Sequence, residues 1–282
     1  MELTFVGRIP RFLGSRTIKR LIISTICFVT QSNIHKTTIG KCTFRVQVNT
    51  EMERNAVLQG SYDSFAKQVC KRFISVDGTS IDVGANVGFW SCDMALNKTT
   101  GTVYSFEPSQ RNFDALTSNI EQNKLGLRVK CFQCGLSSHE ESRQLYKSSD
   151  YGSLSIHKPD VTVFSENMQC GTINLRSLDS FKQDFTSKVD FIKIDVEGYE
   201  FEVLSGAKEL IFSDLPAVLF EVNAYYLVKS GVTLESILTV FPDCYNFYML
   251  KDTRVETLNL RTLLKTTDLF DVLATPEVLS DC

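Results

Sequence analysis

From residue 79 onward, short apolar runs alternate with segments whose apolar residues recur at helical spacing. Residues 79–83 (TSIDV) and 102–106 (TVYSF) are strand-like runs that end at a glycine turn and at a Glu-Pro pair. After the second run, Phe113, Leu116 and Ile120 lie on one face of a helix. Such alternation requires right-handed crossovers, so it predicts a mostly parallel α/β sheet with helices on both faces.

The rest of the chain extends this pattern. Further strands are predicted at 127–136, 190–194, 217–220, 245–250 and 270–274. A helix with one apolar stripe from Phe201 to Ile211 follows the second of these strands. The polar stretch 137–189 predicts an insertion with short strands over the site, and residues 40–75 predict a small strand and helix at the edge of the core.

Carboxylates stand at the ends of four predicted strands, at Asp82, Glu107, Asp195 and Glu221. Parallel strands bring their carboxyl ends to one edge of the sheet, where ligands of such folds bind. Strand ends are also wet and tolerate acids, so a chance alignment is the alternative. The four residues together predict a ligand site at this edge.

The first strand runs into the turn Asp-x-Gly-x-Asn-x-Gly at residues 82–88. A phosphate-binding P-loop is excluded because no Lys-Ser/Thr pair follows the second glycine. A dinucleotide fingerprint is disfavoured because positions 86 and 89 are not glycine. Gly84 permits a tight turn, Asn86 tolerates left-handed backbone angles, and Gly88 lets a helix begin close to the sheet.

Glu107 ends the next strand and can accept both hydrogens of a ribose diol, as the acid of dinucleotide folds does. The turn and this acid predict a ligand that has a ribose but no diphosphate. S-adenosyl-L-methionine fits that description, with Asp82 near its positive charges.

Four blocks carry a resemblance to a known family: IDVGANVGFWS (81–91), YSFEPS (104–109), VDFIKIDVEGYEFEVLSGA (189–207) and AVLFEVN (217–223). In order and spacing they resemble the FkbM family of S-adenosylmethionine-dependent methyltransferases, and the likeness covers about residues 40–278. The resemblance implies a Rossmann-like sheet of seven strands with the last one antiparallel. It also implies O-methylation, often of sugar or polyketide hydroxyls. The motif and the resemblance give the expected cofactor site: Asp82, Gly84, Ala85, Asn86, Gly88, Glu107 and Gln133.

Asp195 and Glu197 are the candidate catalytic residues, because they follow the strand that meets the predicted cavity. Either is a candidate general base, or both hold sugar hydroxyls; an ordinary carboxylate, with a pKa of about 4, is a weak base for an alcohol. For Glu197 the alternative is an acid at a helix N-terminus. Lys193 is expected to have a buried carboxylate partner. His157 lies in a predicted substrate loop, and a solvated surface histidine is its alternative.

Residues 1–45 hold eight Lys/Arg and one acid, whereas the remainder holds 22 bases and 32 acids. The acidic body argues against a nucleic-acid partner. The apolar run at 21–29 is shorter than the roughly 20 residues that span a bilayer. We therefore expect residues 1–35 to be a targeting or anchor segment, with membrane attachment through 19–30, or else a short buried helix or strand, or a tail. Residues 36–282 are expected to form one methyltransferase domain with a core at about 76–278.

No metal site is expected, because Cys131 and Cys134 lack a second pair at zinc-site spacing. Two functions of different classes remain open on the sequence. The first is a methyltransferase that modifies a hydroxyl of a glycan or small hydroxylated molecule. The second is a methyltransferase-like protein that binds a cofactor or partner without chemistry. An NAD-linked oxidoreductase is disfavoured by the missing glycines.

Overall fold

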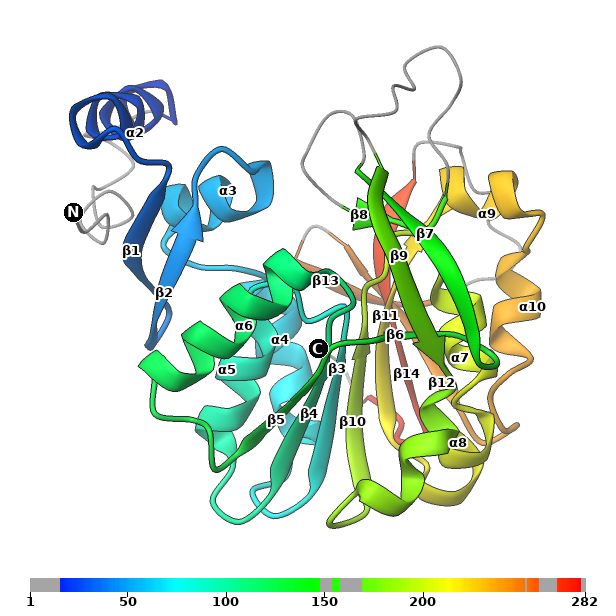
Figure 1. The fold of residues 1–282 in the computed structure, drawn as a ribbon. Coiled ribbons are helices and arrows are strands. Elements are labelled where there is room, and N and C mark those ends of the chain that lie inside the picture. Colours follow the sequence, from blue (N-terminus) through cyan, green and yellow to red (C-terminus); the bar gives the residue numbers. More distant parts are fainter. Residues whose placement is uncertain (1–15, 148–153, 158–168, 252, 259–267, 280–282) are drawn as a thin grey trace.

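The structure is a computed structural model of the 282-residue chain. It describes residues 16–147, 154–157, 169–251, 253–258 and 268–279. A large mixed sheet forms the centre, with helices on both of its faces (Figure 1). A smaller sheet and an N-terminal unit lie near the end of the large sheet where its parallel strands terminate.

The large sheet has eight strands. In spatial order they are β13 (Arg254–Thr257), β12 (Asn246–Lys251), β14 (Leu269–Thr275), β11 (Ala217–Asn223), β10 (Val189–Ile194), β3 (Thr79–Val83), β4 (Thr102–Phe106) and β5 (Val129–Phe132). The strands from β11 to β5 are parallel, and β14 lies antiparallel between β11 and β12. This order confirms the predicted methyltransferase-like α/β fold with its antiparallel last strand. The additional strand β13 pairs with β12 and was not predicted.

Alternate residues of the central strands face two different helical layers. In β11, Ala217 and Leu219 join one apolar cluster, whereas Val218 and Phe220 join the other. The first layer contains α4 (Ser64–Cys70), α5 (Phe89–Asn97) and α6 (Gln110–Gln122). The second contains η3 (Leu178–Asp184), α7 (Glu200–Ser205), α8 (Lys208–Asp214) and α10 (Leu234–Leu238), while α9 (Ala224–Ser230) follows β11 directly. Burial on both sides explains why these strands read as continuous apolar runs.

Two predicted elements are shorter than expected. The strand predicted at 127–136 ends at Phe132, because Gly135 packs against Leu175 and begins a strand of the smaller sheet. The helix predicted from Phe201 to Ile211 is divided into α7 and α8. At the division, a Cβ on Gly206 would lie 2.0 Å from the backbone oxygen of Ser137, so the chain turns there in close contact with another segment.

The smaller sheet arises from the predicted insertion. Its order is β6 (Gly135–Leu136), β9 (Gln169–Arg176), β7 (Glu141–Lys147) and β8 (Leu154–Ser155). Leu145, Ile173 and Leu175 form its apolar cluster, against which Leu154 and Ile156 pack. The insertion therefore presents an apolar surface, as well as short strands, near the end of the large sheet.

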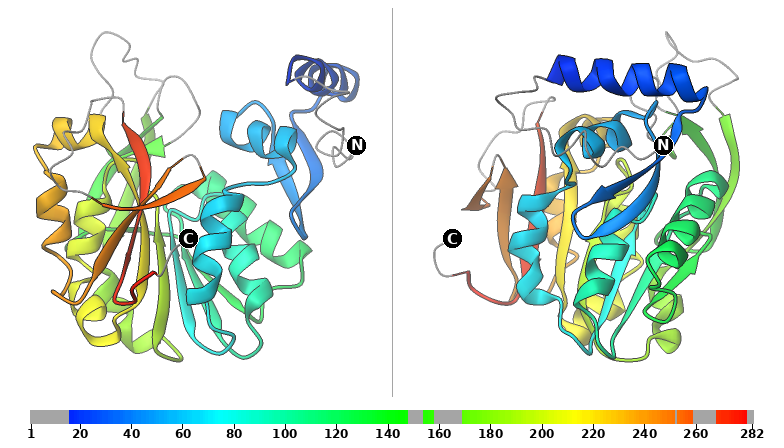
Figure 2. Two further views of the ribbon diagram at one scale, coloured as in Figure 1. Left: turned by 180° about the vertical axis from the view of Figure 1, so that it is seen from behind. Right: turned by 90° about the vertical axis from the view of Figure 1, so that its left-hand side faces the viewer.

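The N-terminal unit comprises α2 (Arg16–Thr30), β1 (Ile34–Ile39), β2 (Cys42–Gln47), α3 (Glu51–Gln59) and η1 (Lys71–Phe73). Figure 2 shows α2, the β1–β2 hairpin and α3 together on one side of the molecule. The Asn119 and Asn123 side chains of α6 accept backbone N–H groups of Arg45 and Thr43 at 2.8 Å, which joins the hairpin to the core. Within the described ranges no helix has both the length and the apolar content that crossing a bilayer requires. Attachment through residues 19–30 stays a prediction.

Candidate active site

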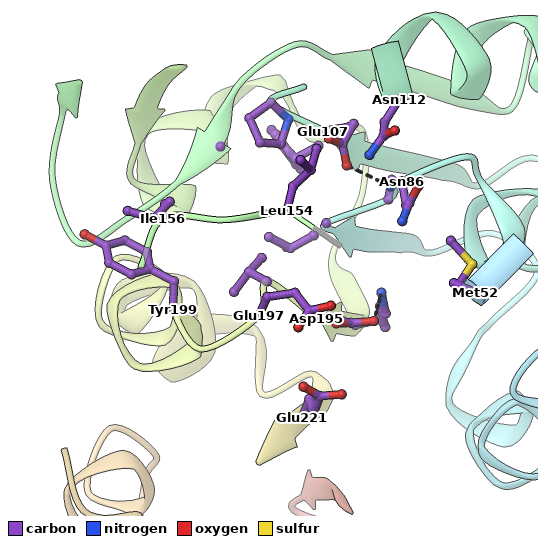
Figure 3. Close-up of a pocket in the computed structure, with 18 of the residues that line it drawn as sticks. Met52, Asn86, Glu107, Asn112, Leu154, Ile156, Asp195, Glu197, Tyr199 and Glu221 are labelled. Carbon is purple, nitrogen blue, oxygen red and sulfur yellow. Dashed lines mark hydrogen bonds and ion pairs between the residues drawn. The ribbon is translucent and has the colours of Figure 1, made fainter. Parts of the chain in front are cut away.

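A cavity of about 670 Å³ opens where the parallel strands β3, β4, β10 and β11 end (Figure 3). Asn86 and Glu107 lie on one side of it, and Asp195, Glu197 and Glu221 lie on another. The cavity thus joins the glycine turn after the first core strand to the acids that follow the fourth and fifth.

The β3–α5 turn has the backbone geometry that its sequence predicts. Gly84 has φ +73°, and a Cβ there would lie 1.9 Å from the backbone oxygen of Asp195. Asn86 has φ +51°, a left-handed conformation that asparagine adopts more readily than most residues. Ala85 lines the cavity, and Gly88, with φ +92°, precedes α5. The turn needs glycine at position 84 because β10 continues directly against it.

Glu107 is buried at the end of β4 and faces the cavity. Its Oε2 accepts the backbone N–H of Asn86 and its Oε1 accepts that of Ser109, both at 2.9 Å. Burial raises the pKa of this carboxyl to about 7, although the backbone hydrogen bonds act in the opposite direction. An ionised carboxylate has about four acceptor positions, so each oxygen retains capacity for a ligand hydroxyl.

Asp82 does not line the cavity. It is fully buried, its Oδ2 accepts the Ser91 hydroxyl at 2.5 Å, and its Oδ1 lies 3.8 Å from Lys193 Nζ. Lys193 in turn lies 3.2 Å from Asp195 Oδ2, which confirms the expected carboxylate partner. Burial opposes the charge of Lys193, but Asp195 and Asp82 raise its pKa above the usual range. Asp82 therefore acts on the cavity through Lys193, not by direct contact.

The two candidate catalytic acids both line the cavity. Asp195 follows β10 directly, and its side chain is 29% exposed. Glu197 has φ +56° and lies before α7 begins. The carboxylate that satisfies the turn is Glu200, which accepts backbone N–H groups of Val196 and Gly198 at 3.1 and 3.2 Å. The helix-terminus role proposed as an alternative for Glu197 thus belongs to Glu200.

Gln133 and His157 lie apart from these groups. Gln133 is outside the cavity lining, and its Nε2 donates to Gln110 Oε1 at 2.8 Å. His157 Nε2 lies 2.9 Å from the Gly198 oxygen, and its ring stacks on Tyr226 with centroids 5.2 Å apart. The histidine supports the loop behind the cavity and does not line it.

Several lining residues were not predicted from the sequence. Met52, Asn55 and Tyr62 come from the N-terminal unit, and Leu145 and Ile173 come from the smaller sheet. None of them belongs to a motif with a recognisable chemical role. Their one available signal was position, because the polar insertion and residues 40–75 were both expected near the site.

The geometry agrees with a comparison with known families, in which a model described as the methyltransferase FkbM domain matches residues 82–245, more than half of the chain. The chain belongs to the FkbM methyltransferase family. Methyltransferase sdnD of Sordaria araneosa is 26% identical over 161 residues, which are 46% of this chain and 60% of that protein. Hexuronic acid methyltransferase AglP of Haloferax volcanii is 30% identical over 181 residues, which are 64% of this chain and 70% of that protein.

A third relative, 31-O-demethyl-FK506 methyltransferase FkbM of Streptomyces tacrolimicus, is 25% identical over 168 residues, which are 50% of this chain and 64% of that protein. This chain thus spans about three fifths of the length of sdnD and of the FK506 enzyme. Membership of the FkbM family implies S-adenosyl-L-methionine as the cofactor.

The residues present fit such a cofactor. The described lining carries six carboxylates and two basic side chains: Glu51, Glu53, Glu107, Asp195, Glu197, Glu221, Arg111 and Lys193. This excess of negative charge suits a ligand that carries a sulfonium and an ammonium group. The Glu107 carboxylate, held at the mouth of the glycine turn, suits a ribose diol.

Proposed function

We propose that this FkbM-family protein is an S-adenosylmethionine-dependent O-methyltransferase that acts on a hydroxyl of a glycan or a small hydroxylated molecule. The observation that carries the proposal is the shared cavity, in which the glycine turn and Glu107 face Asp195 and Glu197. One side has the groups that hold a ribose-bearing cofactor. The other side has carboxylates, which can receive a proton from a hydroxyl.

When bound, S-adenosylmethionine supplies a methyl group on a sulfonium leaving group, so the cofactor carries the difficult chemistry. The protein must align the acceptor with that methyl group and remove the hydroxyl proton. The acceptor oxygen gains the methyl group as its carbon–sulfur bond breaks, and the proton passes to a carboxylate. Asp195 or Glu197 is the receiving group, and Lys193, 3.2 Å from Asp195 Oδ2, fixes the position of that carboxylate.

The printed names of two relatives support a hydroxyl acceptor. One acts on a hexuronic acid, and another methylates a 31-O-demethyl compound. Both descriptions belong to those proteins. For this chain they favour oxygen over nitrogen or carbon as the methylated atom.

Asp195→Asn tests the catalytic assignment. We expect cofactor binding to persist, because Glu107 and the turn are unchanged, while turnover falls by about 10²- to 10⁴-fold. S-adenosylhomocysteine formation, measured with a panel of glycans and hydroxylated compounds, reports turnover, and calorimetry reports binding. Glu209→Gln, on α8 outside the cavity lining, serves as the control. Undiminished turnover in Asp195→Asn would remove that residue from catalysis, and cofactor binding without turnover in the unmodified protein would favour a non-catalytic role.

A further inference from the structure

The acceptor end of the cavity is formed by the residues that follow β10 and β11. The two strands pair in parallel with Ile194 opposite Phe220, so Asp195 and Glu221 follow side by side. Both line the cavity together with Glu197. Figure 3 shows Glu221 beyond Asp195, on the side away from Glu107. An acceptor that approaches the Asp195 carboxylate therefore also meets Glu221.

No positive side chain among the described lining residues is available to offset these acids. Lys193 lies 3.2 Å from Asp195 Oδ2, and Arg111 lies 3.4 Å from Glu53 Oε1 on the opposite side. These two are the basic residues of the described lining, and each already has a carboxylate partner. A second carboxylate, brought in by the acceptor, would find no free cation there.

The same end of the cavity is rich in aromatic surface. Tyr199, Tyr225 and Tyr226 line it, and Tyr225 is 42% exposed. Tyr226 is fixed in place, because its ring stacks on His157 and lies where a Cβ on Gly198 would be, 2.4 Å away. Rigid aromatic rings beside hydrogen-bond acceptors suit a ligand with apolar C–H faces and outward hydroxyls.

A metal ion does not explain the acids. In the part of the chain that the structure describes, no group of three or more His, Cys, Asp or Glu side chains is arranged to hold one. Burial and the neighbouring Asp195, Glu200 and Glu197 raise the pKa of Glu221 well above its usual range. A carboxylate in that condition gains from a hydroxyl donor and loses from a further negative charge.

We propose that the acceptor is an uncharged, polyhydroxylated ring, a neutral sugar, whose hydroxyls donate to Glu221, and that acceptors bearing a carboxylate are rejected. This inference rests on the proposed O-methyltransferase function and specifies its acceptor. It separates this chain from the hexuronic acid methyltransferase of Haloferax volcanii, whose acceptor carries an acid group. Glu221 is the residue that determines this specificity.

The test compares methyl glycosides of neutral hexoses with the corresponding methyl hexuronosides at pH 8.5. Initial rates of S-adenosylhomocysteine formation give kcat/KM for each acceptor. We expect the neutral glycosides to be favoured at least about tenfold, which corresponds to about 1.4 kcal/mol. Glu221→Gln should narrow that ratio at least about threefold, because it removes the repulsion of the uronate. Glu256→Gln, an exposed change on β13, should leave the ratio unchanged.

The outcomes distinguish this inference from the function on which it rests. Absence of S-adenosylmethionine binding by calorimetry would overturn the proposed function. Binding followed by equal rates on uronates and neutral sugars would overturn the charge selection and leave the methyltransferase function intact. A Glu221→Gln ratio equal to that of the unmodified protein would remove Glu221 from specificity. If no neutral glycoside reacts or binds the S-adenosylhomocysteine-loaded protein in saturation-transfer NMR, the sugar assignment is wrong.

Discussion

Replacing Glu107 by glutamine tests the cofactor side of the cavity, because the change keeps the size of the side chain and removes its charge. Both carboxylate oxygens accept backbone N–H groups, from Asn86 and Ser109, at 2.9 Å. An amide has one acceptor oxygen, so its NH₂ group would face one of these donors or the ribose. A hydrogen bond to a charged group contributes about 1.5–3 kcal/mol. Losing one such bond should raise the Kd for S-adenosylmethionine roughly 10- to 100-fold.

The same carboxylate determines how cofactor affinity should depend on pH. Burial raises the pKa of Glu107 to about 7, so at pH 6 about one tenth of the free protein carries the ionised form. If the ionised form binds the ribose, the apparent Kd should rise roughly tenfold between pH 8 and pH 6. The glutamine variant has no charge to lose at this position, so its Kd should vary with pH much less.

Isothermal titration calorimetry at pH 6, 7 and 8 measures both effects. Glu121→Gln, an exposed change on α6, is the matched control and should retain the affinity and the pH slope of the unmodified protein. Circular dichroism at each pH shows whether the variants are folded. A Kd for Glu107→Gln within about twofold of the control, with the same pH slope, would refute the ribose assignment.

Three further changes test the framework of the site. Gly84→Ala introduces a Cβ 1.9 Å from a backbone oxygen at φ +73°, so we expect a loss of about 2 kcal/mol or more and a Tm lower by about 4–8 °C; equal Tm values for this variant and Gly126→Ala, where the Cβ meets nothing within 4 Å, would contradict the close approach. Lys193→Met leaves the buried Asp82 without a cation, so urea unfolding should show a loss of about 3–5 kcal/mol, and an unchanged midpoint would contradict that pairing. Asp271 has a pKa raised to about 7 by burial and nearby acids. Its folded-state pKa exceeds the unfolded value near 3.8, so the stability it contributes below pH 4 is lost as the pH rises through 7. Asp271→Asn should therefore raise Tm at pH 8 but not at pH 4, and an equal gain at both would contradict the shift.

The parts of the site that follow from local chemistry could be predicted from the sequence. Gly84 and Asn86 adopt left-handed angles that few other residues tolerate, and Glu107 lies at a strand end that Pro108 marks. Asp82 was less predictable. Position alone placed it near the cavity, whereas its side chain turns inward to Ser91 and Lys193. The facing direction of a strand residue depends on which helix packs beside it, and the sequence does not state that.

Elements fixed by contacts between distant segments were harder to predict. Gly135 leaves the large sheet because it pairs with Leu175, which lies 40 residues later in the chain, so the apolar run at 127–136 could not reveal where the strand ends. Gln133 consequently lies beyond the end of β5, outside the cavity lining. The division between α7 and α8 has a similar cause, the contact between Gly206 and Ser137. Local periodicity carries no information about such contacts.

The distribution of lining residues separates the two halves of the proposed reaction. The glycine turn, Glu107 and Asp195 lie within residues 82–245, the region that the family shares. Met52, Tyr62 and Leu269 also line the cavity, yet they lie outside that region. A cofactor common to the family requires similar residues, whereas acceptors that differ among relatives require different walls. The acceptor should therefore be sought from the N-terminal unit, the smaller sheet and the β11–α9 junction, because these segments enclose the cavity beyond the shared core.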